Sequence, residues 1–252
     1  MSALTAVVSA NGLIVAFLAV GLLLWLSYFM SAQITGGRIH GSAIAILLGL
    51  LAAYWAGRAT GGSRGLADIS LLAGIGLMGG GMLRDFAIVS TAFGVHPSEL
   101  RKAGLAGSLS IVVGVLVSFV LGAAVAVAFG YRDAESITTI GAGAVTYIVG
   151  PVTGTAIGAS SEVLALSVTT GVVKSILVMV FTPLLARRIG LNNPQAAMVF
   201  GGLMGTTSGV AGGLAATDPR LVPYGAMTAT FYTGAGCLLA PSVLYLLVRA
   251  LT

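Results

Sequence analysis

Residues 141–158 read GAGAVTYIVGPVTGTAIG, and residues 201–213 read GGLMGTTSGVAGG. Glycine at this density weakens a helix in lipid, and Pro151 removes a backbone hydrogen-bond donor from the first tract. A bilayer tolerates broken backbone only where protein or a water-filled cavity satisfies the freed polar groups. Two such interruptions in one apolar chain are typical of a transport site near the middle of a membrane. Close packing of helices through small residues is the alternative interpretation of these glycines.

The composition around these tracts is that of a membrane protein. The mean hydropathy is +1.05 and only 8% of the 252 residues are charged, which excludes an ordinary soluble domain. The net charge of +5 does not indicate nucleic-acid binding, because most Lys and Arg residues lie in short loops between apolar segments. The single cysteine, Cys237, and two histidines offer little for metal binding or acid–base catalysis. We therefore expect no enzyme, no transition-metal site and no cofactor.

Six apolar segments predict transmembrane helices, each near the length that a hydrocarbon core requires. They lie at 12–33, 42–57, 68–94, 104–130, 162–186 and 222–248. The two Gly/Thr-rich tracts lie between the later segments, and their broken backbone predicts re-entrant helical hairpins. The sequence thus predicts an all-α integral membrane protein, folded as a single polytopic domain.

Both hairpins fall in the second half of the chain, which suggests that the two halves have different roles. We expect residues 1–133 to form scaffold-like helices and residues 134–252 to form a hairpin-bearing transport half. Segments 138–186 and 196–248 each contain a hairpin followed by a crossing helix, and they would form an inverted repeat. An elevator-like movement of this half against the first is the natural hypothesis.

The basic residues give only a mild indication of orientation. If each tract enters and leaves on one side, six basic residues lie on one face and four on the other. The first group is Arg38, Arg101, Lys102, Arg187, Arg188 and Arg220; the second is Arg58, Arg64, Arg132 and Arg249. The excess places the first group in the cytoplasm and the amino terminus outside. A first tract that crossed fully would reverse this bias, so the count does not choose between hairpin and crossing.

Charged residues inside apolar segments are candidates for the substrate site. Lys174 lies near the centre of its segment, where an ionised side chain costs roughly 3 kcal/mol by insertion scales. We predict that it binds or balances an anionic substrate; snorkelling to the membrane surface is the alternative. Arg84 and Asp85 lie in the third segment and can neutralise each other, although the Arg84 guanidinium also suits a carboxylate.

The hairpin tips supply the remaining candidates. A break between half-helices exposes N–H groups that attract anions and carbonyls that can coordinate sodium, and Thr and Ser hydroxyls add neutral donors. The predicted substrate-binding residues are Thr153, Gly154, Thr155, Lys174, Gly205, Thr206, Thr207, Ser208 and Arg84. The predicted sodium-binding residues are Thr146, Gly150, Thr206 and Ser208.

Four strings carry a resemblance to a known family. They are residues 38–46 (RIHGSAIAI), 74–80 (GIGLMGG), 141–154 (GAGAVTYIVGPVTG) and 201–219 (GGLMGTTSGVAGGLAATDP). They resemble the MadM subunit of the bacterial malonate:sodium symporter over nearly the whole chain. The order of hairpins and helices also looks, more distantly, like the LrgB/CidB family.

The resemblance to MadM implies malonate uptake coupled to sodium, in the bacterial inner membrane, together with a small membrane subunit, MadL. We expect a higher-order oligomer of that two-subunit unit and no nucleic-acid partner. The alternatives are another small carboxylate, a proton in place of sodium, or a holin-like, regulatory membrane protein of the LrgB type.

Overall fold

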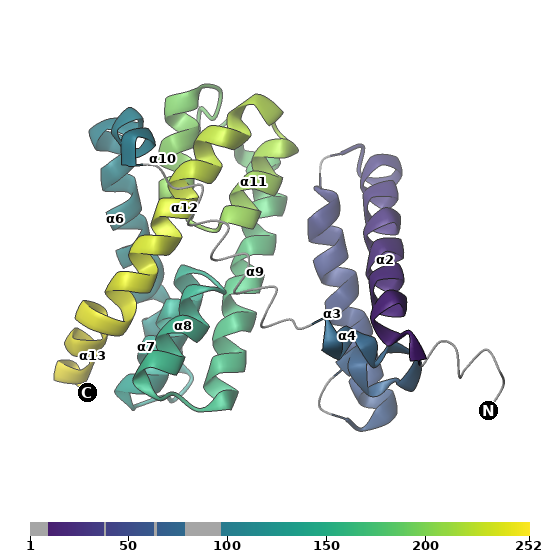
Figure 1. The fold of residues 1–252 in the computed structure, drawn as a ribbon. Coiled ribbons are helices and arrows are strands. Elements are labelled where there is room, and N and C mark those ends of the chain that lie inside the picture. Colours follow the sequence, from purple (N-terminus) through teal and green to yellow (C-terminus); the bar gives the residue numbers. More distant parts are fainter. Residues whose placement is uncertain (1–9, 38, 63–64, 79–96) are drawn as a thin grey trace. The chain divides into compact units, whose positions relative to one another are not determined.

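The computed structural model describes residues 10–37, 39–62, 65–78 and 97–252, which are helical or lie in turns between helices. The chain divides into two compact units, Met1–Val89 and Ser90–Thr252 (Figure 1). Five helices of the described residues are long and apolar enough to cross a membrane. The predicted all-α membrane class is therefore confirmed.

The first unit contains two long helices, α2 (Gly12–Ile34) and α3 (Gly41–Thr60), which pack against each other. Three short helices follow, η1 (Gly65–Asp68), η2 (Ser70–Leu72) and α4 (Gly74–Leu77). The predicted crossing at 68–94 is therefore described only in its first part. Arg84 and Asp85 lie outside the described residues.

The second unit contains the remaining elements, including α6, which was assigned to the scaffold from the sequence. Its long helices are α6 (Pro97–Ala128), bent at Gly104, and α9 (Ser161–Leu185), followed at the carboxyl end by a continuous run of α12, η4 and α13. That run comprises α12 (Val222–Leu239), η4 (Ala240–Leu244) and α13 (Tyr245–Leu251). Pro241 lacks an N–H for the ordinary helical bond, which accounts for the wider π-helical turn at η4.

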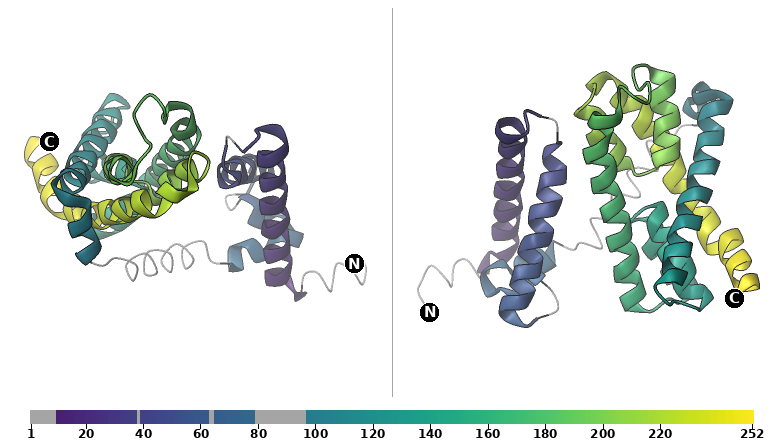
Figure 2. Two further views of the ribbon diagram at one scale, coloured as in Figure 1. Left: turned by 90° about the horizontal axis from the view of Figure 1, so that it is seen from above. Right: turned by 180° about the vertical axis from the view of Figure 1, so that it is seen from behind.

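Two pairs of short helices lie between the long ones. The first pair is α7 (Ala134–Val145) and α8 (Val149–Ile157), and the second is α10 (Pro194–Met204) and α11 (Thr207–Ala215). At 1.5 Å per residue the longest of the four extends about 18 Å, well short of a hydrocarbon core of about 30 Å. The pairs occupy opposite ends of the second unit, α7 and α8 at one end and α10 and α11 at the other (Figures 1 and 2). The inverted repeat of segments 138–186 and 196–248 stays a prediction.

The helix starts follow the side-chain signals in the sequence. The Ser160 hydroxyl accepts a hydrogen bond from the N–H of Val163 at the start of α9, and the Asn193 side chain does the same at the start of α10, where Pro194 follows.

The first break lies earlier than the sequence suggested. It spans residues 146–148, where the Thr146 hydroxyl accepts the N–H groups of Ile148 and Val149 and so begins α8. Pro151 lies in the first turn of α8, where a missing N–H costs nothing because no intrahelical acceptor is available. The expectation that Pro151 breaks the helix, with a tip at 153–155, was wrong.

Candidate functional site

Both helix breaks lie against the middle of α9. A methyl group at Gly171 of α9 would overlap the backbone nitrogen of Tyr147, in the first break. On the next turn of α9, a methyl group at Gly209 of α11 would lie 2.8 Å from the Ser175 carbonyl oxygen. Glycine at 171 and 209 thus allows the two breaks to approach one helix closely, one turn apart.

Hydrogen bonds join the two breaks to each other and to α9. The Tyr147 hydroxyl, from the first break, lies 3.4 Å from the hydroxyl of Ser208, in the first turn of α11. The hydroxyls of Ser175 and Thr206 also form a hydrogen bond. The sequence predicted contact between residues 153–155 and the second tip; the structure instead joins residue 147, in the first break, to that tip.

Lys174 lies at this junction. Its ammonium group donates to the Ser118 hydroxyl at 2.9 Å, the Val145 carbonyl at 3.0 Å and the Tyr232 hydroxyl at 3.0 Å. All three acceptors are neutral, and the Val145 carbonyl belongs to the last residue of α7, directly before the first break. Three neutral acceptors satisfy the donors of the ammonium group but leave its charge without a counter-ion among these contacts. The junction therefore suits an anion.

Tyr232 of α12 ties the junction to the surrounding long helices. It is completely buried, and its hydroxyl also donates to the Gly114 carbonyl of α6 at 3.3 Å. Its ring packs on Gly205, the residue that ends α10 with a φ of 71°, so that a methyl group there would overlap the ring. Neither Tyr232 nor Ser118 was predicted from the sequence, because each reaches Lys174 only through the tertiary fold and belongs to no recognisable motif.

The start of α11 supplies backbone donors just after Gly205, on which the Tyr232 ring packs. The Thr206 hydroxyl accepts the N–H of Gly209, and the Thr206 carbonyl accepts the N–H of Val210. The N–H groups of Thr207 and Ser208, the first two residues of the helix, have no acceptor within it. Together with the positive end of the helix dipole, these two N–H groups favour a carboxylate.

The remaining predicted substrate residues lie apart from this junction. Thr153 and Gly154 are buried inside α8, one to two turns beyond the break, and Thr155 is exposed on the outer face of that helix. Of the residues predicted to bind sodium, Thr146 and Gly150 flank the first break, while Thr206 and Ser208 flank the second. The second helix interruption, between α10 and α11, falls within the predicted tip residues, and the first falls about two turns before residues 153–155.

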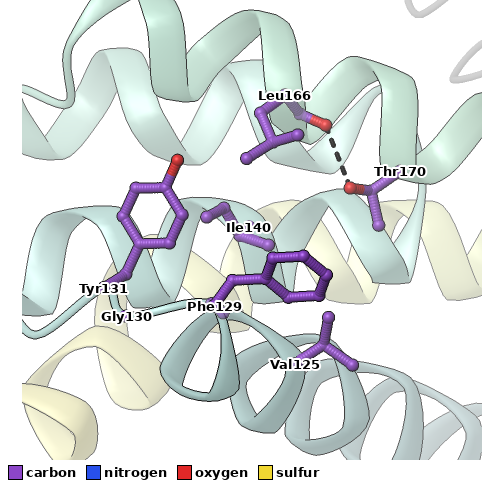
Figure 3. Close-up of a pocket in the computed structure, with 8 residues that line it drawn as sticks. Val125, Phe129, Gly130, Tyr131, Ile140, Leu166 and Thr170 are labelled. Carbon is purple, nitrogen blue, oxygen red and sulfur yellow. Dashed lines mark hydrogen bonds between the residues drawn. The ribbon is translucent and has the colours of Figure 1, made fainter.

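A separate hollow of about 340 Å³ lies on the second unit, between the end of α6, α7 and α9 (Figure 3). Its lining is mostly apolar and carries no charge: Val125, Ala126, Phe129, Gly130, Tyr131, Ile140, Leu166 and Thr170. The Thr170 hydroxyl is already bonded to the Leu166 carbonyl. The hollow is therefore poorly suited to a dicarboxylate.

Comparison with known proteins identifies one family. The family model described as "Malonate/sodium symporter MadM subunit" matches residues 4–252, nearly the whole chain. Searches of curated proteins and of solved structures gave no match.

Proposed function

Because the chain belongs to the malonate/sodium symporter MadM family, we propose that malonate binds at the junction of the two helix breaks, with one carboxylate on Lys174. The family assignment makes the protein a multi-pass membrane subunit that transports malonate together with sodium. The single observation that carries the proposed location is the Lys174 ammonium group, which is bonded to neutral acceptors beside both breaks.

The second carboxylate of malonate would bind the start of α11. The N–H groups of Thr207 and Ser208 provide two donors there, and the Ser208 hydroxyl provides a third. Malonate has a single carbon between its carboxylates, so both charges must be met within one small site. The hydrogen bond between Tyr147 and Ser208 supports a site of that size, because it shows how closely the two breaks approach.

Binding at Lys174 would also change the first hairpin. A carboxylate can reach the ammonium group only by displacing one of its three present acceptors. Ser118 and Tyr232 lie on long helices, whereas the Val145 carbonyl lies at the free end of a short one. Displacement of the Val145 carbonyl would release the tip of α7 from α9, and this release would connect substrate binding to a movement of the hairpin.

We expect the end of the second unit that carries α10 and α11 to face the cytoplasm. Arg187, Arg188 and Arg220 follow or precede helices at that end, and Arg101 opens α6 there, whereas Arg132 and Arg249 lie at the other end. The excess of positive charge favours the cytoplasmic side. The hairpin-bearing half, residues 134–252, is expected to move against the first half in an elevator-like manner.

A small second membrane subunit, MadL, is the proposed partner, and a higher-order assembly of the two is expected. The family description, which calls the protein a subunit, supports a partner of this kind. If uptake by the chain reconstituted alone equals uptake by the chain with MadL, the partner is not required.

Transport in proteoliposomes tests the function. Labelled malonate should accumulate in vesicles that contain the chain and its partner when the sodium gradient points inward, and not when potassium replaces sodium. The binding location is tested in the same vesicles with Lys174→Met, which should lower accumulation sharply at malonate concentrations near the wild-type dissociation constant. Accumulation driven by a proton gradient in the absence of sodium, or undiminished uptake by the variant, would contradict the corresponding part of the proposal.

A further inference from the structure

Three threonine hydroxyls inside the first hairpin have no hydrogen-bond partner. They belong to Thr138 and Thr139 of α7 and to Thr153 of α8, and all three residues are completely buried. Within the residues that the structure describes, they are the only buried side-chain oxygen or nitrogen atoms in this condition. A buried hydroxyl without a hydrogen-bond partner is destabilising. Three such hydroxyls in one hairpin therefore indicate that a bound ligand satisfies them.

The three hydroxyls lie at one level of the hairpin. Thr139 packs against Gly154, where an added methyl group would come within 3.0 Å of the Thr139 hydroxyl oxygen. Thr153 is the neighbour of Gly154, and Thr138 is the neighbour of Thr139. Because α7 and α8 pack against each other along their length and run in opposite directions, all three threonines fall within about one helical turn of the same level.

Thr138 and Thr153 also share a side of the hairpin. Thr138 precedes Ala142 by one turn, and Thr153 follows Val149 by one turn, so each threonine extends the helix face of that apolar residue. Ala142 and Val149 pack together with Ala240 in one core cluster. The two hydroxyls therefore continue the face that packs toward the π-helical turn η4, which contacts both α7 and α8.

We propose that these three hydroxyls contribute to the site of the coupling cation, sodium. Hydroxyl oxygens are ligands for small hard cations. An anion is disfavoured, because the backbone N–H groups of these mid-helical residues are used within their own helices. The nearest acidic side chain along α7 is Glu135, one turn before Thr138 and Thr139, where it accepts a hydrogen bond from Tyr245 at 2.7 Å.

The hydroxyls at the breaks are less available to sodium. Thr146 accepts two backbone N–H groups, and Thr206 accepts one and is also bonded to Ser175. These bonds hold the two breaks in shape. The hydroxyls of Thr138, Thr139 and Thr153 form no hydrogen bond of this kind. This assignment rests on the proposed function, since it takes sodium as the coupling ion.

Valine substitutions with a sodium titration test the cation site. Thr153→Val and Thr138→Val nearly conserve volume and remove only the hydroxyl, Thr153→Ser keeps it, and Thr169→Val removes an exposed hydroxyl from α9. The full chain in lipid nanodiscs is melted in sodium chloride and in potassium chloride, without malonate. The sodium concentration that half-saturates malonate uptake is then measured in proteoliposomes with the partner subunit.

Sodium should raise the melting temperature of the wild type, Thr153→Ser and Thr169→Val, and should not raise that of the two valine variants at 138 and 153. Those variants should be at least as stable as the wild type in potassium, because an unpartnered hydroxyl is lost. Their half-saturating sodium concentration should rise about tenfold or more.

The inference is overturned if the wild type shows no sodium-specific stabilisation, or if both valine variants keep the wild-type response. An equal loss of stability in sodium and potassium, with the sodium requirement unchanged, would show that the hydroxyls hold water only and would also overturn it. Failure of the function itself is distinguishable, because the wild type would then take up no malonate in a sodium gradient.

Discussion

Lys174→Met is expected to weaken malonate binding by about one to two orders of magnitude. The substitution keeps much of the side-chain length and removes the charge together with three donors that now lie 2.9–3.0 Å from their acceptors. A hydrogen bond between charged groups contributes about 1.5–3 kcal/mol. That range corresponds to a rise of about 10- to 150-fold in the dissociation constant for malonate.

The folded state should tolerate this substitution. Two effects on stability oppose each other: removal of a charge from an apolar region relieves about 3 kcal/mol, whereas loss of the bonds to Ser118, Val145 and Tyr232 costs a similar amount or more. We therefore expect a modest shift in melting temperature and normal insertion into the membrane. Purified variants in detergent would be assayed for labelled malonate binding at saturating sodium, with thermal unfolding measured on the same samples.

Two further variants separate charge from hydrogen bonding. Lys174→Gln keeps at most two hydrogen-bond donors, on a shorter side chain, and carries no charge, whereas Lys174→Arg keeps the charge. Binding should fall with Lys174→Gln nearly as far as with Lys174→Met, and should be retained best by Lys174→Arg. Wild-type malonate affinity in a folded Lys174→Met protein would refute the reasoning and make Lys174 a structural residue.

Three more substitutions test the breaks. Gly205→Ala should abolish uptake and lower the free energy of unfolding by about 2–4 kcal/mol, because it combines a left-handed backbone with overlap of the Tyr232 ring. The control Gly190→Ala has a φ of 67° and no neighbour within 4 Å, so it should lower that free energy by only about 1–2 kcal/mol and preserve uptake. Thermal unfolding and vesicle uptake would measure both variants. Thr206→Val should lower stability by about 1 kcal/mol and weaken uptake, because it removes the hydroxyl that caps α11. Thr206→Ser keeps a hydroxyl and should have wild-type stability and uptake. If the Val and Ser variants behave alike, the Thr206 hydroxyl does not cap the helix. Pro151→Ala should change stability by less than about 1 kcal/mol and preserve uptake. A severe loss of stability or uptake would show that Pro151 does cause the helix break.

The arrangement of long helices was accessible from the sequence, since hydropathy alone fixes which segments can cross a membrane. The predicted segments at 104–130, 162–186 and 222–248 correspond closely to α6, α9 and the run from α12 to α13. Lys174 was also identifiable, because a lone cation in the middle of an apolar segment is costly and therefore informative.

The position of the first break does not follow from the general rule that proline interrupts a helix. Proline ends a helix only in its interior, and Pro151 falls in a first turn, where proline is favoured. Thr146 was the better signal, since a threonine side chain can cap a helix that begins after it. Tyr232 and Ser118 could not have been found at all, because they approach Lys174 from α12 and α6 and are 58 and 56 residues away along the chain.

The most direct test of the central claim is an experimental structure of the protein with its partner subunit, determined in lipid with malonate and sodium. Density for malonate should lie within hydrogen-bonding distance of the Lys174 ammonium group and of the first N–H groups of α11, with the Val145 carbonyl displaced. Malonate density elsewhere, with Lys174 still bonded to Ser118, Val145 and Tyr232, would contradict the account.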